Sequence, residues 1–355
     1  MRIVITGASG NVGSALLRRL VSSGDHEVVG IARRPPSAGH PFDQVQWVSL
    51  DLTDRASTEA LPSAFAAADA VVHLAWGFQP SHDLRYLEAL GVGGTRRVLH
   101  AAAAAQVPHV IHMSSVGAYS PKRDDSPVDE SWPTNGVPSS PYSRHKSAAE
   151  RLLDVHERAR PGALFTRMRP GIVGQRSAGS SLLRYGIPAA VPAALLGHLP
   201  ILPLDRRLAI PMVHADDVAD AIVRSLIARA PGAFNLCADP PLTTEHIAAA
   251  LAARPVHVPA ALIRAAMSLT WQARMQQVDP GWLDLGYAVP LMDTTRASQE
   301  LGWAPRNEAI SVLDETISGM RKASSDSTAV LRPRTVAAQL LQLVRRGPIS
   351  QRRRP

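Results

Sequence analysis

The chain has 355 residues, of which 45% are apolar and 19% charged, a balance typical of globular proteins that excludes disordered and fibrous classes. Its net charge of +8 equals that of residues 320–355 alone, which carry nine Lys or Arg and one Asp, so residues 1–319 are neutral overall. This distribution predicts no specific nucleic-acid partner. The single cysteine, Cys237, excludes an intrachain disulfide and fits a reducing compartment.

Short β-rich runs alternate with helical patterns along the first half of the chain. The predicted strands are Arg2–Thr6, Glu27–Ala32, Ala70–Ala75, His109–Ser114 and Leu164–Met168, and the predicted helices are Val12–Ser23 and Gly94–Ala105. This alternation indicates an α/β fold, a Rossmann doubly wound parallel sheet.

Beyond Gly174 prolines become frequent and strand signals sparse. We expect a first domain over 1–174, with returns to the sheet near 208–240, at Val213–Ala219 and Gly232–Cys237. A smaller, mostly helical C-terminal substrate domain is expected over 175–207 and 240–320, with helices at Thr244–Ala253 and Ala260–Met275. Residues 321–355 are expected to form a basic tail.

The longest apolar stretch, Leu182–Leu204, contains charged residues and four prolines, so it does not predict a membrane-spanning helix. The apolar run before Gly7 is too short for a signal peptide, and we expect a cytoplasmic location. In the tail, Thr335–Arg346 places apolar residues on one helical stripe. A loosely docked or disordered extension is the simpler interpretation, and attraction to an anionic surface or a partner is the alternative.

A glycine-rich loop follows the first predicted strand and opens the first helix, with the pattern Gly7-x-x-Gly10-x-x-Gly13. Glycines permit a tight turn and let backbone N–H groups approach a pyrophosphate at the helix N-terminus. The loop therefore predicts dinucleotide binding. Its expected contacts are Gly7, Ser9, Gly10, Asn11, Val12 and Gly13.

Tyr142 and Lys146 lie four residues apart on a predicted helix that Ser140 caps and Pro141 begins, so both project from one face. A nearby ammonium lowers the pKa of a phenol, and the pair can then act as a general acid/base at a carbonyl or hydroxyl. Upstream, Ser114 and Ser115 end a predicted strand, where a hydroxyl could bind the same substrate oxygen.

These motifs together resemble the extended short-chain dehydrogenase/reductase family, the NAD-dependent epimerase/dehydratase group, over roughly residues 1–315. The resemblance rests on the glycine loop, Asp51-Leu52, Val71–Ala75, the Ser-Ser strand end, Tyr142/Lys146, Arg169-Pro170-Gly171, Val213–Ala219 and Leu301–Pro305. It implies that Tyr142 is the acid/base, that Lys146 also holds the nicotinamide ribose, and that Ser115 orients the substrate oxygen. It further implies cofactor contacts at Asp51, Leu52, Leu74, Ala75, Trp76, Ser114, Pro170, Ile172 and Val173.

Two departures from the family pattern concern the substrate. Gly91 stands where many relatives carry an asparagine, so any proton relay through that side chain must differ here. Gly171, Ile172 and Val173 fill a gap in which nucleotide-sugar epimerases commonly place an asparagine against the diphosphate. This departure puts a sugar-nucleotide substrate in doubt, and the apolar stretch from Leu182 hints at a less polar one, although simple packing explains that stretch better.

The cofactor is expected to be NADP(H), with NAD(H) as the alternative. NAD-using Rossmann domains place an acid at the end of the second strand to bind the ribose 2′-hydroxyl. Here that position is Ala32, and Arg33 and Arg34 follow it. Two guanidinium groups suit a 2′-phosphate.

We therefore expect an NAD(P)-dependent oxidoreductase or epimerase that transfers hydride at a carbon bearing oxygen of a small-molecule substrate. The alternatives are an NADPH-dependent carbonyl reductase of an apolar substrate and a non-catalytic NAD(P)-binding sensor or scaffold. The histidines and Cys237 show no zinc-ligand spacing, so no metal site is expected. A homodimer is left open.

Overall fold

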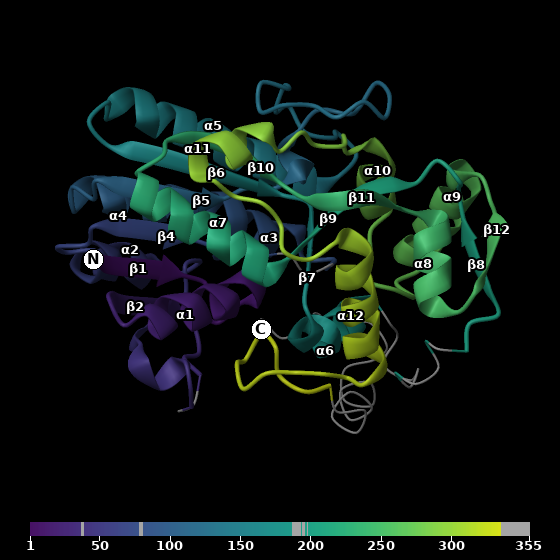
Figure 1. Ribbon diagram of the computed structural model, residues 1–355, viewed down its shortest axis with the longest axis horizontal. Helices are drawn as coiled ribbons and strands as arrows, with labels where there is room; N and C mark the ends of the chain where they lie inside the picture. Colours follow the sequence, from purple (N-terminus) through teal and green to yellow (C-terminus); the bar gives the residue numbers. More distant parts are fainter. Residues whose placement is uncertain (37–38, 78–80, 187–192, 194–195, 197, 335–355) are drawn as a thin grey trace.

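The computed structural model describes residues 1–36, 39–77, 81–186, 193, 196 and 198–334. Seven parallel strands form its central sheet (Figure 1). They are β1 (Arg2–Thr6), β2 (Glu27–Ala32), β3 (Gln46–Ser49), β4 (Ala70–His73), β5 (His109–Met113), β6 (Leu164–Pro170) and β10 (Gly232–Leu236). Their order is β10-β6-β5-β4-β1-β2-β3. The chain thus winds outward in both directions from β1 and β4, whose carboxyl ends form the switch point where doubly wound sheets bind ligands. The predicted Rossmann sheet is confirmed, although β3 was not among the predicted strands.

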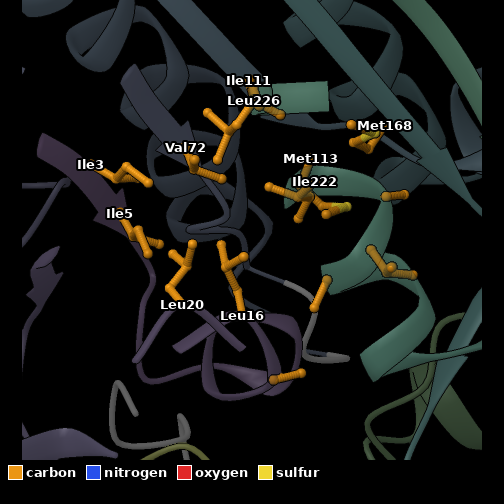
Figure 2. Packing of buried hydrophobic residues seen from close by; sticks show 14 of the residues in the cluster. Ile3, Ile5, Leu16, Leu20, Val72, Ile111, Met113, Met168, Ile222 and Leu226 are labelled. Carbon is orange, nitrogen blue, oxygen red and sulfur yellow. The ribbon is translucent and has the colours of Figure 1, made fainter. Parts of the chain in front are cut away.

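Helices cover both faces of the sheet (Figure 1). On one face lie α1 (Asn11–Ser23) and α7 (Ala215–Ala228), and on the other lie α2 (Arg55–Ala64), α4 (Gly94–Ala104) and α5 (Pro141–Ala159). Successive residues of β1 serve opposite faces, because Ile3 and Ile5 pack with α1 and α7 whereas Val4 packs with the other helices. Figure 2 shows Ile3 and Ile5 in one cluster with Leu16, Leu20, Ile222 and Leu226.

A smaller part of the chain lies beyond the carboxyl ends of the strands, at the right of Figure 1. One of its two sheets, in the order β11-β9-β7, contains β7 (Ile172–Gly174), β9 (Ala209–His214) and β11 (Ala238–Thr243). The other pairs β8 (Ile201–Leu204) with β12 (Arg254–His257). Its helices are α6 (Gly179–Gly186), α8 (Thr244–Leu251), α9 (Ala260–Gln272), α10 (Gly281–Ala288) and α12 (Ala309–Arg321). Shorter helices are Phe42–Gln44, α3 (Leu84–Glu88), Ala89–Gly93, Val116–Ala118 and Arg176–Ala178.

One expected return to the central sheet is wrong. The sequence predicts a strand over Val213–Ala219, but β9 ends at His214, pairs with β7 and β11, and is followed at once by α7. The helix starts there because His214 Nδ1 accepts a hydrogen bond from the Asp216 N–H (3.1 Å). Asp216 and Asp217 also place carboxylates in the first helical turn, where they are favoured. The other return, β10, lies beside β6 as expected.

The stretch that contains α11 (Thr295–Leu301) was expected in the smaller domain but packs on the sheet domain. Arg296 donates to the Ala233 carbonyl of β10 (3.0 Å). Trp303 is 1% exposed in the main core cluster, and its indole N–H donates to the Asp217 carbonyl (2.9 Å). The chain therefore crosses back over the sheet before it forms α12.

Residues 322–334 pack against α6 instead of forming a free extension. The Ser181 hydroxyl donates to the Val330 carbonyl (2.6 Å), and the side chains of Thr328 and Leu331 are buried. The basic tail expected from residue 321 onward is therefore anchored in its first part. The helix predicted over Thr335–Arg346 lies outside the described residues, as does part of the apolar stretch Leu182–Leu204. Within the described ranges no helix combines the length and the apolar character that a membrane crossing requires.

Candidate active site

The residues expected at the cofactor gather at the carboxyl ends of the parallel strands. After β1 comes the glycine loop with Gly7, Ser9, Gly10, Asn11, Val12 and Gly13. After β2 come Arg33 and Arg34, after β3 come Asp51 and Leu52, and after β4 come Leu74, Ala75 and Trp76. After β5 come Ser114 and Ser115, while β6 contains Pro170 and β7 contains Ile172 and Val173. Because parallel strands end at one edge of the sheet, the fold brings together residues that lie far apart in the sequence.

The start of α5 places Tyr142 beside Ser115. Ser140 caps the helix by accepting from the Ser143 N–H (3.4 Å), and Pro141 occupies the first turn, as predicted. The hydroxyl groups of Tyr142 and Ser115 share a hydrogen bond. Gly117 makes this approach feasible, because a Cβ there would lie 2.9 Å from the tyrosine ring.

Lys146 lies one helical turn after Tyr142, with its ammonium buried. Its Nζ donates to the Met113 carbonyl (2.7 Å) and lies 3.7 Å from the centroid of the Trp76 ring, a cation–π geometry. The same nitrogen is 5.9 Å from the centroid of the Tyr142 ring. Burial lowers the pKa of Lys146 to about 7, and the carboxylate of Glu150 opposes that shift.

The lowered pKa expected for Tyr142 is wrong for this arrangement. Burial raises the pKa of the phenol to about 12, and the hydrogen bond with Ser115 offsets only part of that shift. The reason is desolvation, which penalises the phenolate more than the neighbouring groups stabilise it. Tyr142 is therefore a neutral phenol at physiological pH and is set up to donate a proton.

A buried ion pair fixes α5 against the sheet directly behind Lys146. Glu150 accepts from Arg169 of β6 through both carboxylate oxygens (2.8 and 2.5 Å) and from the Ser114 hydroxyl (2.5 Å). Burial alone would raise the pKa of Glu150, but the hydrogen bonds and charge of Arg169 outweigh it and hold this pKa below its ordinary value. Arg169 also donates to the Tyr119 hydroxyl (3.0 Å), which donates to Asn235 of β10 (2.6 Å).

Two buried histidines, His73 of β4 and His112 of β5, lie close enough to Lys146 to be affected by its charge. His73 bonds Thr6 (2.6 Å) and Thr95 (3.0 Å) through its two ring nitrogens, whereas neither nitrogen of the buried His112 has a partner among the described residues. The two rings are 5.3 Å apart. Burial first, and then the charge of Lys146, lowers the pKa of His73 to about 3. Burial, and then the charges of His73 and Lys146, hold the pKa of His112 well below its ordinary value. Both imidazole rings are therefore neutral.

The glycine loop has the shape that a dinucleotide needs. Gly7 has φ +75°, and a Cβ there would lie 2.6 Å from the Ala75 nitrogen. A Cβ on Gly13 would lie 2.4 Å from the Gly7 carbonyl oxygen. Only backbone fits between β1, β4 and α1, which leaves the N–H groups of the first turn of α1 open to a pyrophosphate. The residues present therefore fit the cofactor that the motif implies.

Asn11 ties this loop to the other expected cofactor residues. Its side-chain amide donates to the Val173 carbonyl of β7 (3.1 Å), and Gln175 donates back to the Asn11 side chain (2.6 Å). Ile172, beside them, is 46% exposed and available to a ligand.

The two arginines after β2 differ in their surroundings. Arg33 donates to the Tyr86 hydroxyl (2.8 Å) and lies 3.8 Å from a carboxylate oxygen of Asp51, whose other oxygen accepts from the Thr53 N–H (2.9 Å). Arg34 is exposed. Arg34 is thus the freer of the two to meet a ligand, while Arg33 borders the expected adenine residues.

Aromatic rings flank Tyr142 on two sides, which the sequence did not predict. Trp282 of α10 lies 4.9 Å from the Tyr142 ring, and Trp76 meets it edge-on at 6.3 Å, both measured between centroids. Sequence reasoning gave no role at the site to Trp282, Glu150, Asn235 or His112. Of these, only Glu150 carries a local signal, because it continues the helical stripe of Tyr142 and Lys146 by four residues.

Comparison with known proteins agrees with this geometry. Residues 3–237 match the NAD dependent epimerase/dehydratase family. The chain belongs to that family. The family predicted from the sequence motifs is thereby confirmed.

This chain aligns with only part of the length of its curated relatives. An uncharacterized protein of Mycobacterium tuberculosis is 28% identical over 320 residues, 89% of this chain and 29% of its own length. A UDP-glucose 4-epimerase of Mycolicibacterium smegmatis is 33% identical over 166 residues, 44% of this chain and 51% of its own length. The chain therefore spans about a third to a half of these relatives.

Solved structures share the fold at low identity. The Thermus thermophilus UDP-glucose 4-epimerase in complex with NAD superposes with a TM-score of 0.67 at 22% identity, covering 91% of this chain and 100% of that chain. The Bacillus cereus UDP-glucuronic acid 4-epimerase in complex with NAD gives 0.66 at 18% identity, covering 91% and 99%. These likenesses establish the architecture.

We predict that Glu150→Gln lowers the free energy of unfolding by about 3–5 kcal/mol, because it leaves the Arg169 charge buried without its counter-ion. Urea denaturation measures the loss. Glu157→Gln on the same helix is the matched control, since the Glu157 side chain is 42% exposed and its buried partner Arg167 keeps the Asp154 carboxylate. A loss under about 1 kcal/mol for Glu150→Gln, no larger than that of the control, would contradict the structural role of the pair.

We predict that His112→Leu flattens the pH dependence of stability. An imidazole that stays neutral in the native state but titrates near pH 6.5 when unfolded removes about 1.4 kcal/mol of stability per pH unit below 6.5. Native stability is therefore present above that pH and falls as the pH drops. Urea titrations at pH 7, 6 and 5 should give a slope smaller by about that amount in the variant, and an unchanged slope would show that His112 titrates normally in the native state.

Proposed function

We propose that the chain transfers hydride between a nicotinamide dinucleotide and a carbon bearing oxygen, with Tyr142 as the acid/base. The observation that carries this proposal is the grouping of Tyr142, Ser115 and Lys146 beside the glycine loop at the carboxyl edge of the sheet. Each group has a distinct chemical role there.

Tyr142 and Ser115 bind the substrate oxygen together. Their hydroxyl groups already share a hydrogen bond, so an oxygen placed between them accepts one bond from each. Because Tyr142 is a neutral phenol, it supplies the proton when a carbonyl oxygen becomes a hydroxyl. In the reverse direction its phenolate, once formed, takes the proton back.

Lys146 acts on Tyr142 at short range and holds the cofactor. Its Nζ lies 3.7 Å from the Trp76 ring centroid and 5.9 Å from the Tyr142 ring centroid, and this nitrogen would bond the ribose hydroxyls of the cofactor. When bound, the nicotinamide supplies or accepts the hydride. The glycine loop, Asn11 and Val173 hold the pyrophosphate end, and Pro170 and Ile172 border the nicotinamide end.

Reduction of an apolar carbonyl compound is the version that the site favours. Trp76 and Trp282 place aromatic surface on both sides of Tyr142, and Ile172 and Val173 add apolar side chains near the expected nicotinamide position. Epimerisation of a UDP-sugar is the second candidate, favoured by the M. smegmatis UDP-glucose 4-epimerase among the relatives. A protein that binds cofactor but turns over neither class would act as a sensor.

The cofactor in this proposal is NADP(H). Ala32 ends β2 and offers no carboxylate to a ribose 2′-hydroxyl, whereas Arg33 and Arg34 follow it. Guanidinium groups bind phosphate monoesters through paired hydrogen bonds. The absent acid and the two added cations both favour a 2′-phosphate.

We expect Tyr142→Phe to lower turnover by about 10²- to 10⁴-fold while NADPH binding is retained, because only the proton donor is removed. Turnover is followed as NADPH oxidation with a panel of aromatic and aliphatic aldehydes and ketones, and as interconversion of UDP-glucose and UDP-galactose. Tyr287→Phe, on α10 and hydrogen-bonded to the Asp205 N–H, is the matched control. A Tyr142→Phe enzyme with near wild-type turnover would disprove the acid/base assignment.

We expect the wild type to bind NADPH more tightly than NADH, and Ala32→Asp to invert that preference by introducing a carboxylate that repels phosphate and accepts from a 2′-hydroxyl. Arg34→Ala should weaken NADPH by about 10- to 100-fold and leave NADH nearly unchanged. Titration of both cofactors by intrinsic fluorescence measures these constants. Tighter binding of NADH by the wild type would refute the NADP(H) assignment.

A further inference from the structure

The N-terminus of α1 has no side-chain cap. Gly10 precedes the helix and, as a glycine, has no side chain that could accept a hydrogen bond from the first turn. A helix end without a cap tends to fray, yet a ligand that binds to the N–H groups of that turn needs them at fixed positions. A side-chain cap would also occupy one of those N–H groups. Another contact must therefore hold this turn and leave its N–H groups available.

Gln175 makes such a contact from the segment between β7 and the short helix Arg176–Ala178. It is 4% exposed, and its side-chain amide donates to the Asn11 carbonyl (2.8 Å) and to the Asn11 side-chain oxygen (2.6 Å). The Asn11 side-chain amide in turn donates to the Val173 carbonyl (3.1 Å). These three bonds use the carbonyl and the side chain of Asn11, the first residue of α1, and they use no backbone N–H of the helix.

A second contact joins Gln175 to the same helix two turns further on. Arg18 lies seven residues after Asn11, on the same face of α1, and donates to the side-chain oxygen of Gln175 (3.1 Å). Arg18 also donates to Asp216 in the first turn of α7 (2.8 Å). Both polar atoms of the Gln175 side chain therefore have partners on α1, which fixes the amide in one orientation along the helix.

The arrangement does what a cap does without using a donor that the ligand needs. We propose that Gln175 is a positioning residue for the cofactor, which holds the first turn of α1 so that its N–H groups face the pyrophosphate. Gln175 acts through Asn11 and does not touch the cofactor itself. This inference rests on the dinucleotide binding of the proposed function. It does not depend on the choice between NADP(H) and NAD(H), because both contain the pyrophosphate.

The first test measures the binding of three pyrophosphate compounds, NADPH, NADH and ADP-ribose, to the full-length protein by titration calorimetry. Gln175→Met keeps the length of the side chain and removes its amide, so it should weaken all three ligands to the same degree, by about 10-fold. Gln299→Met, which changes an exposed glutamine of α11, is the matched control and should leave binding unchanged.

A double variant tests whether Gln175 acts through Asn11. Asn11→Ala removes one of the two acceptors of the Gln175 amide, so the two single changes break a shared contact. Their combination should weaken NADH by clearly less than the product of the two single effects. A glutamine that only stabilised the fold would give independent effects, which multiply.

Amide hydrogen exchange without cofactor gives a readout that does not depend on ligand binding. The Ser14 N–H donates to the Gly10 carbonyl (2.9 Å) and closes the first turn of α1. Its exchange should be about 10-fold faster in Gln175→Met than in the wild type, because the turn opens more often, whereas amides in the middle of α5 should be unaffected.

The outcomes separate this inference from the proposed function. If the wild type binds the three ligands and Gln175→Met behaves like Gln299→Met, the role of Gln175 is overturned and dinucleotide binding stands. Multiplied effects in the double variant, or unchanged exchange at Ser14, also overturn that role alone. A wild type that binds none of the three ligands overturns the proposed function and this inference with it.

Discussion

The buried pair of Glu150 and Arg169 is the interaction on which the candidate site depends. Tyr142, Lys146 and Glu150 succeed one another at four-residue spacing on α5, so one stripe of this helix carries the phenol, the amine and the carboxylate. The two hydrogen bonds from Arg169 of β6 to Glu150 fix that stripe against the sheet. The Ser114 hydroxyl, just after β5, also donates to the Glu150 carboxylate. An ion pair at this depth is costly to leave half formed, which makes the register of α5 over the strands well defined.

Burial also sets the proton chemistry of the site. Tyr142 and Lys146 lie in a region with little solvent, where the neutral form of each is favoured, and the pKa of the phenol rises to about 12 while that of the ammonium falls to about 7. The neutral histidines behind them, His73 and His112, add no opposing charge. The neutral phenol that results is the form that the proposed proton transfer requires, and the rings of Trp76 and Trp282 lie close to it.

The residues proposed to hold the cofactor come from distant parts of the chain. The loop after β1 fits only backbone between Gly7, Gly13 and Ala75, a shape that suits recognition of a pyrophosphate by N–H groups. After β2 the proposal depends on charge, because Arg33 and Arg34 follow Ala32.

The sequence alone determined the sheet, the glycine loop and the Tyr142–Lys146 stripe, because each depends on local periodicity, glycine chemistry or four-residue helical spacing. It also located the helix cap at Ser140 and the missing acid at Ala32. Only the tertiary structure decided what surrounds these groups. The partnership of Glu150 with Arg169 and the aromatic rings around Tyr142 join residues from separate elements, and no local pattern encodes such distances. The expected return of Val213–Ala219 to the central sheet was wrong for the same reason, since the sequence of a strand does not specify which strand it pairs with. Desolvation, which reversed the expected pKa of Tyr142, is likewise a property of the packed molecule.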